Sequence, residues 1–282
     1  MKMVKYMKIF MRVVIILITV IFIMPIAISV ISSLMTPTEI MYRTGNLQHD
    51  IGRPEGLTFM PETISIRQYY MVMVESSGYL VMFWNSVLYA TSITAATLLL
   101  AIPVAFLFAK IRLSILNKLF FIFIVVMMLP FQVSMLSNYM ILSKIGLIGT
   151  RLAVIIPTVF APTGVFLLRQ TMRSIPDEQI DAMLLESSSV NKVLIYVILP
   201  GIKPGIITTG ILVFAESWNM IDRPGIFLNQ MAEMPLSLAL NGLIFYSPES
   251  SFAGSVVFML PMLFIFLLFH KKIIKGLEYF IW

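Results

Sequence analysis

Long apolar stretches are the feature that most limits how this chain can fold. They recur along most of its length, carry almost no charge, and approach or exceed what is needed to cross a bilayer core of about 30 Å. Only 12% of the residues are charged, whereas soluble domains have about 25%. A backbone in lipid must satisfy its own hydrogen bonds, and a helix does so within one segment. We therefore expect an all-α membrane protein.

The apolar stretches predict six transmembrane helices in a single domain that covers residues 1–282. The first stretch is longer than the 7–15-residue core of a signal peptide, so we interpret it as a retained span. A long loop, 36–81, separates it from the second stretch. The six predicted spans lie at about 13–34, 82–109, 119–142, 152–168, 205–220 and 252–269.

Lysine and arginine residues are divided unevenly between the two sides that these spans define. Fourteen lie in the N-terminal segment, the 110–118 loop, the 171–203 loop with its flanks and the C-terminal tail, and six lie in the other loops. Cytoplasmic loops collect such residues. We therefore expect both termini and the 171–203 loop in the cytoplasm and the 36–81 loop outside it. This arrangement accounts for the net charge of +6 without a nucleic-acid partner.

A polar segment from Ile175 to Pro204 lies between the fourth and fifth predicted spans. Acidic residues gather in its first half, and its second half becomes apolar before Leu199-Pro200. A polar helix of this length between two spans indicates a binding partner outside the membrane. Its polar residues include Asp177, Glu178, Asp181, Glu186, Asn191 and Lys192.

Residues for catalysis or for an ion-driven cycle are scarce. The chain has no cysteine, its two histidines, His49 and His270, lie far apart in sequence, and no lysine follows a glycine as in a phosphate-binding loop. Glu216 is the one acidic residue inside a predicted span, where it either reaches the membrane interface or lines a pathway. Energy must then come from a partner or from an ion gradient. Besides a transporter subunit that is powered by a partner, the alternatives are a gradient-driven transporter or channel subunit and an intramembrane enzyme.

One spacing within the polar segment is specific. Asp181-Ala182-Met183 is followed by three residues, Ser187, nine residues and Val197-Ile198-Leu199-Pro200. This pattern resembles the cytoplasmic signature of the inner-membrane permeases of ATP-binding-cassette importers, which reads Glu-Ala-Ala, three residues, Gly, nine residues, Ile-x-Leu-Pro. The chain departs from it most notably at Ser187, because glycine would permit a sharp turn between two short helices.

Further short motifs resemble the carbohydrate permeases of the maltose type within that family. The resemblance covers about residues 60–277. It implies the type I importer permease fold of six transmembrane helices with a cytoplasmic coupling helix at about Asp177–Ser187. The motifs are Asn85-Ser86, Leu129-Pro130, Gly146-Leu147, Trp218-Asn219 and Lys275-Gly276-Leu277.

The resemblance also implies the partners. A second, different six-span permease, two ATPase subunits that bind ATP and Mg and an extracytoplasmic solute-binding protein would complete a transporter in a bacterial cell membrane, that is, an inner or plasma membrane. The chain itself would be no enzyme and would hold no cofactor. The expected cargo is a sugar or oligosaccharide, with a peptide or a phosphodiester as the alternative, and the binding protein would largely select it.

Two sets of site residues follow, and neither includes a catalytic or metal-binding residue. The resemblance implies that the coupling residues contact the ATPase, with apolar contact from Met183, Leu184 and Leu185. These coupling residues are Asp181, Ala182, Met183, Leu184, Glu186, Ser187, Leu199 and Pro200. Polar and aromatic residues in spans three and five are candidates to line the substrate pathway: Gln132, Asn138, Tyr139, Glu216, Trp218 and Asn219.

Overall fold

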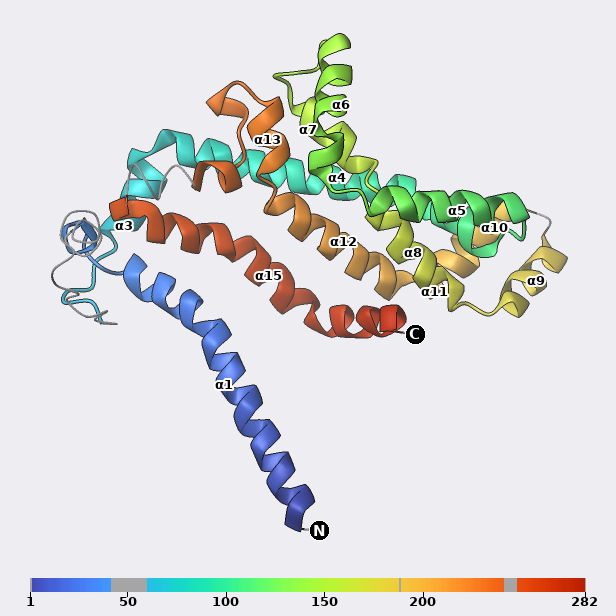
Figure 1. The fold of residues 1–282 in the computed structure, drawn as a ribbon, viewed down its shortest axis with the longest axis horizontal. Coiled ribbons are helices and arrows are strands. Elements are labelled where there is room, and N and C mark those ends of the chain that lie inside the picture. The colour runs from blue at the N-terminus through green and yellow to red at the C-terminus, as the bar shows by residue number, and fades with distance from the viewer. Residues whose placement is uncertain (1, 42–59, 188, 241–247, 282) are drawn as a thin grey trace. The chain divides into compact units, whose positions relative to one another are not determined.

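Every regular element that the structure describes is a helix (Figure 1). The structure is a computed structural model that describes residues 2–41, 60–187, 189–240 and 248–281. Residues 42–59 of the expected 36–81 loop lie outside this description. Within the described ranges the expected all-α fold class is confirmed.

Four helical stretches are long and apolar enough to cross a membrane. They are Tyr6–Ser33, Ser77–Lys110, Arg151–Arg173 and Glu249–Ile273. Two pairs of helices also qualify when each pair is taken together, but both pairs are bent: Ser114–Met127 with Phe131–Lys144 by 97°, and Val190–Gly201 with Lys203–Trp218 by 76°. If each bent pair is one crossing, the described residues hold the six crossings that the apolar stretches predict.

The bend in the third predicted span has a local cause. The expected single helix over 119–142 is instead α5 (Ser114–Met127) followed by α6 (Phe131–Lys144). Pro130 caps the start of α6 with φ −64° and ψ 145°. Proline has no amide hydrogen to donate, and its ring disfavours a helical conformation at Leu129. The helix therefore stops before Pro130 and restarts after it in a new direction.

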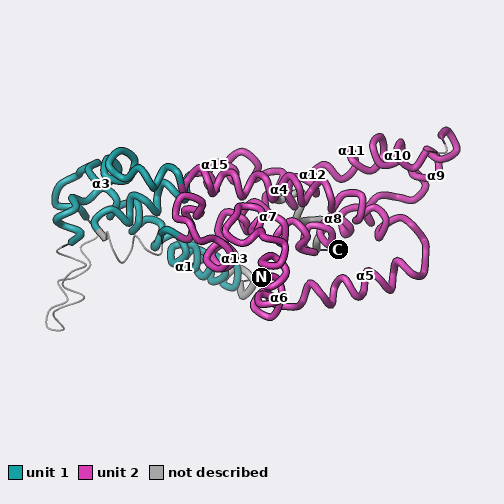
Figure 2. Tube along the Cα trace, turned by 90° about the horizontal axis from the view of Figure 1, so that it is seen from above, with its two compact units in different colours: residues 1–81, 239–260 teal, residues 82–238, 261–282 magenta. Residues whose placement is uncertain are grey.

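The chain divides into two compact units, which are coloured separately in Figure 2. Unit 1 comprises Met1–Val81 and Ala239–Leu260. It contains α1 (Lys2–Ser33), α3 (Arg67–Tyr70), the π-helical turn η1 (Met71–Glu75) and the first residues of α4 (Ser77–Lys110) and α15 (Pro248–Ile281). The predicted first, second and last spans fall on α1, α4 and α15.

A buried glutamine holds the end of α1 within unit 1. The Gln68 side-chain amide donates hydrogen bonds to the carbonyl oxygens of Ser32, at 2.8 Å, and Met35, at 2.9 Å. Helix ends leave carbonyl groups without partners inside the helix, and the Ser32 carbonyl is one of them. It also accepts a hydrogen bond from the amide of Met35, which lies just beyond the end of α1. In contrast, the 18 most apolar residues of α1 bury no side chain within the structure, as suits a helix surrounded by lipid or other helices.

Unit 2 comprises Met82–Leu238 and Pro261–Trp282 and carries most of the buried side chains. Besides most of α4 it contains α5, α6, α7 (Arg151–Val159), α8 (Thr163–Arg173), α9 (Asp177–Glu186), α10 (Val190–Val193), η2 (Leu194–Ile198), α11 (Leu199–Gly201), α12 (Lys203–Trp218), α13 (Asp222–Phe227) and η3 (Met231–Glu233).

Two apolar clusters lie along α4 in unit 2. One packs Tyr89 and Ile93 of α4 with α7, α12 and α13. The other packs Ala101, Ala105 and Phe106 of α4 with α8 and with the turns that lead into α12. Because α4 contributes to both clusters, it forms a common support for the helices of unit 2 (Figure 1).

Candidate functional site

The polar segment after α8 folds as a short helix, α9, with its own start and stop signals. Pro176 caps it in an extended conformation, and Asp177 and Glu178 place negative charge in its first turn, where the helix dipole favours it. The helix ends at Glu186, after which Ser187 has φ −150° and ψ 121°. Any residue adopts this extended backbone, so the turn needs no glycine at 187.

The two faces of α9 differ. Ile180 and Met183 are half-buried and pack against the apolar cluster that includes α4 and α8. Met183 therefore points toward the body of unit 2, whereas the sequence motif suggested contact with a partner. On the other side Asp181, Ala182 and Glu186 are exposed.

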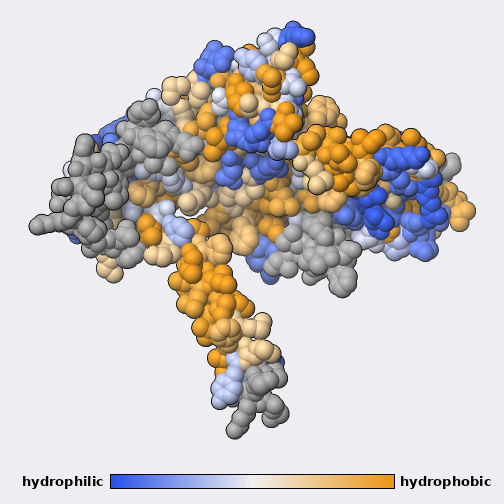
Figure 3. Space-filling view, viewed as in Figure 1, coloured by the Kyte–Doolittle hydropathy of each residue, from blue (hydrophilic) through white to orange (hydrophobic). Residues whose placement is uncertain are grey.

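Two leucines add an apolar surface to the exposed side of α9. Leu184 is 38% exposed and Leu185 is 91% exposed. In Figure 3 the surface of α9 and α10 is largely hydrophilic, in contrast to the mostly hydrophobic surface of α1. An exposed apolar side chain surrounded by polar ones matches the apolar core and polar rim of a protein–protein interface.

Asp177 attaches the start of α9 to the end of α4. Its two carboxylate oxygens accept hydrogen bonds from the Lys110 ammonium group, at 2.9 Å, and from the Arg112 guanidinium group, at 2.6 Å. Lys110 also donates to the carbonyl oxygen of Ile175. The Lys110 side chain is only 6% exposed, whereas that of Arg112 is 83% exposed. We call this group the Asp177 joint.

The charge state of the joint is fixed at ordinary pH. Hydrogen bonds from Lys110 and then Arg112 lower the pKa of the Asp177 carboxyl group below its usual value. A lowered pKa means that the joint is complete above the unfolded-state pKa and is lost only as the pH falls through the folded value. Neutral and mildly acidic media therefore leave it intact.

Leu199 and Pro200 lie on α11, in the bent segment that precedes α12. Leu199 is half-buried and Pro200 is exposed. The neighbouring Gly201 comes close to Ile175, because an added Cβ atom there would lie 3.0 Å from the Ile175 Cδ1 atom. Apart from Met183, the coupling residues thus occupy two places, the exposed side of α9 and the bend at α11, and Ser187 lies between them in the chain.

The candidate pathway residues do not form one group. Trp218 is 1% exposed and packs between Phe83 and Phe214, with both ring centroids 5.8 Å away, so it belongs to the core. Glu216 and Asn219 are exposed, and the Asn219 amide bonds back to its own helix. Tyr139 is 41% exposed on α6.

Two pathway candidates on α6 do make polar contacts. The Gln132 amide donates to the Asp222 carboxylate of α13 at 3.4 Å, and the Asn138 amide donates to the Ser134 hydroxyl at 3.4 Å. Next to Gln132, the Arg223 guanidinium group lies 4.6 Å from the centre of the Phe131 ring. The sequence analysis missed Arg223, because a single arginine in a loop carries no spacing signal.

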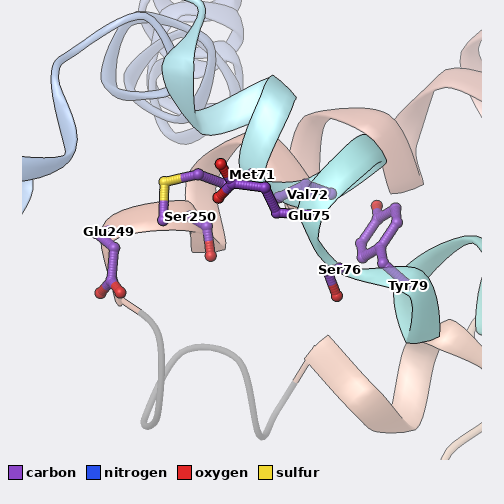
Figure 4. A pocket seen from close by; sticks show the side chains of 7 residues that line it. All are labelled: Met71, Val72, Glu75, Ser76, Tyr79, Glu249 and Ser250. Atoms are coloured by element: carbon purple, nitrogen blue, oxygen red, sulfur yellow. The ribbon is translucent and has the colours of Figure 1, made fainter.

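A shallow cavity of about 210 Å³ lies in unit 1, between η1 and the start of α15 (Figure 4). Glu75 and Glu249 contribute carboxylates to its lining, and Glu75 is already paired with Arg67 at 2.7 Å. Across the described residues, no three His, Cys, Asp or Glu side chains come close enough to hold a metal ion. The cavity therefore offers no metal centre.

Comparisons with known proteins place these features in context. The family model described as "Binding-protein-dependent transport system inner membrane component" matches residues 101–279. A permease protein of the arabinooligosaccharides transport system of Halalkalibacterium halodurans is 28% identical over 78% of this chain and 80% of its own length. A permease protein of the sn-glycerol-3-phosphate transport system of Brucella abortus is 21% identical over 70% of this chain and 71% of its own length.

A solved structure shares the fold. It is a chain of a bacterial ABC transporter involved in the import of the acidic polysaccharide alginate, with a TM-score of 0.78 and 19% identity. The match covers 95% of this chain and 96% of the other. At this identity the similarity shows that the two chains share an arrangement of helices. It does not show that they share a cargo.

Proposed function

Since the chain belongs to the family of binding-protein-dependent transport system inner membrane components, we propose that it is the permease subunit of an ATP-driven importer of a sugar or oligosaccharide. The exposed side of α9 carries this proposal. It presents Leu185, which is 91% exposed, among Asp181 and Glu186, on a helix anchored from behind by Ile180 and Met183. A partner with an apolar groove rimmed by basic residues would fit it.

In this proposal the energy comes from outside the chain. Two ATPase subunits bind and hydrolyse Mg-ATP, and one of them holds α9 in its groove. A second, different six-span permease completes the pathway, and an extracytoplasmic binding protein delivers the cargo. Both termini and α9 then lie in the cytoplasm, in accord with the excess of lysine and arginine on that side. Closure of the ATPase pair would move α9 and rock the helices attached to it.

The proposed cargo rests on the relatives. Both the relative with 28% identity and the solved structure belong to carbohydrate systems by their names, whereas the less similar Brucella protein is named for a phosphate ester. Gln132, Asn138 and Glu216 remain candidates to line the pathway, because carboxylates and amides hydrogen-bond sugar hydroxyl groups. Trp218 is a weaker candidate because it is buried.

Uptake by the purified assembly tests this function. The chain, tagged and expressed with the products of its neighbouring genes, should copurify with an ATPase. In proteoliposomes it should take up radiolabelled oligosaccharide only with the binding protein outside and ATP inside. An ionophore that collapses ion gradients should leave this uptake unchanged.

Two results would contradict the proposal. Uptake that survives ATP depletion and stops with the ionophore would indicate a gradient-driven transporter. Uptake of sn-glycerol-3-phosphate in place of the oligosaccharide would keep the importer but overturn the sugar cargo.

A further inference from the structure

The segment of α4 from residue 85 to residue 110 is bonded at both ends to loops of unit 2. At one end the Asp177 joint attaches Lys110 to α9. At the other end α4 side chains bind residues 232–236, a segment that begins within η3 and that we call the 232–236 loop. At 1.5 Å per residue the segment spans about 38 Å, enough to cross the apolar core of a membrane.

The α4 side chains that contact the 232–236 loop are buried, and their hydrogen bonds are short. The Asn85 amide donates to the carbonyl oxygens of Ala232, at 2.7 Å, and Met234, at 3.1 Å. The Tyr89 hydroxyl group donates to the Glu233 carbonyl oxygen at 3.0 Å. These bonds fix the loop to α4 through its backbone, so the loop moves with the helix whatever side chains it carries.

Two further hydrogen bonds strengthen the attachment of the loop to α4. The Leu236 amide donates to the Ser86 hydroxyl group at 2.8 Å, and Ser86 is 1% exposed. The Arg151 guanidinium group donates to the Asn85 side-chain oxygen at 3.2 Å, which holds the Asn85 amide in its orientation. Buried polar groups lose far more when a partner is removed than exposed ones do. The attachment of this loop is therefore firm.

At the other end of the α4 segment, Lys110 makes defined polar contacts. Lys110 is nearly buried, and its ammonium group has two oxygen partners, the Asp177 carboxylate and the Ile175 carbonyl. Loss of the carboxylate would leave a buried positive charge with only a carbonyl acceptor, which is unfavourable. Arg112 is exposed, so its share of the joint is screened by solvent. Asp177 and Lys110 are the pair that holds α9 to α4.

We propose that residues 85–110 of α4 link the ATPase-docking helix α9 to the 232–236 loop, with Asp177–Lys110 and Asn85 as the two joints. The proposal rests on the proposed function and adds a route by which ATP binding on one side changes the loop on the other. Because coupling between two sites is reciprocal, a binding protein on that loop would also act on the ATPase. Asp177 and Asn85 are positioning residues in this scheme.

Hydrogen exchange in the assembled transporter tests the link. The complex that copurifies with this chain is placed in nanodiscs, and exchange is measured with and without Mg-ATP and vanadate. In the unaltered protein both 178–186 and 231–238 should respond. In Asp177→Asn the response at 231–238 should fall at least about fivefold, the lower bound of typical coupling, while the response at 178–186 persists.

Four further variants make the test specific. Asp177→Glu, which keeps a carboxylate, should restore most of the response at 231–238. Asn85→Ala removes two of the four hydrogen bonds between α4 and the 232–236 loop and should cause the same loss, and the double variant should lose no more than either one. Glu75→Gln, which removes an exposed carboxylate paired with Arg67, should behave as the unaltered protein.

The outcomes separate the link from the function beneath it. A full response at 231–238 in Asp177→Asn, with a normal response at 178–186, would overturn the link and leave the proposed function intact. A lack of response at 178–186 in the unaltered complex would overturn the ATPase docking and the link together. If Asp177→Asn fails to assemble, Asn85→Ala decides the same question from the other end.

Discussion

Leu185→Arg is expected to reduce ATP-dependent uptake at least about tenfold while the protein still inserts in the membrane. A hot-spot residue near the centre of a docking surface costs about 2 kcal/mol or more when truncated, and about 1.4 kcal/mol is tenfold in affinity. Leu185 is 91% exposed and makes little contact within the chain, so the change should leave folding nearly unaffected. Uptake and ATPase copurification, both measured per amount of inserted protein, check the prediction.

Val190→Arg is the matched control for this change. Val190 is 52% exposed and begins α10, so it adds the same charge to the same loop without altering α9. It should keep uptake close to normal. Equal losses in both variants would mean that added charge, and not the loss of a docking contact, disables the transporter. Normal uptake by Leu185→Arg would exclude Leu185 from the docking surface.

Gly205→Ala should destabilise the whole of unit 2 through one methyl group. A Cβ atom at 205 would lie 2.3 Å from the Cγ2 atom and 2.9 Å from the Cβ atom of Thr171, so α12 cannot keep its distance from α8. Overpacking of this kind costs about 1–3 kcal/mol. For a chain of this size that corresponds to a fall in Tm of about 5 °C, which melting of the purified protein in detergent would reveal.

Two companions test the steric cause. Gly225→Ala places its methyl group 3.6 Å from the nearest atom, an ordinary contact, and should leave Tm unchanged or slightly higher. Thr171→Ala removes the two nearest atoms and should recover part of the loss when combined with Gly205→Ala. A Tm for Gly205→Ala equal to that of Gly225→Ala would show that α8 and α12 separate without cost.

Hydropathy alone predicted most of the helices because lipid leaves the backbone few alternatives. The long helices α4 and α15 contain the expected spans at 82–109 and 252–269, and α1, which ends at Ser33, contains all but the last residue of the span expected at 13–34. Hydropathy did not predict the 97° bend between α5 and α6, because a single proline hardly changes the mean hydropathy of residues 119–142. Pro130 was visible in the sequence, yet proline in a membrane helix signals either a slight kink or a full break.

The helix α9 was predicted from the motif, and its orientation was not. The spacing from Asp181 to Pro200 identifies a helix and a bend, but it does not tell which side of α9 faces the protein. Met183 turned out to face inward and Leu185 outward, because the packing of Ile180 against the cluster around α4 and α8 fixes the rotation of the helix.

Contacts between residues far apart in the chain could not be predicted from the sequence. Lys110 and Asp177 are 67 positions apart, and Asn85 and Ala232 are 147 apart. No periodicity relates such pairs, so only the fold reveals them. The role of Trp218 was equally open, because an aromatic residue near the end of a span can line a pathway or pack in a core. Its contacts with Phe83 and Phe214 show that it packs in the core.

Cross-linking from Leu185 tests most directly whether α9 docks on an ATPase. The chain has no cysteine, so Leu185→Cys can carry a single benzophenone maleimide, with exposed Asn229→Cys as the control on the loop expected outside. On irradiation of membranes that hold the whole transporter, the label at 185 should join the chain to the ATPase, and the label at 229 should not. An adduct of the label at 185 with the extracytoplasmic binding protein, or no ATPase adduct at all, would contradict the account.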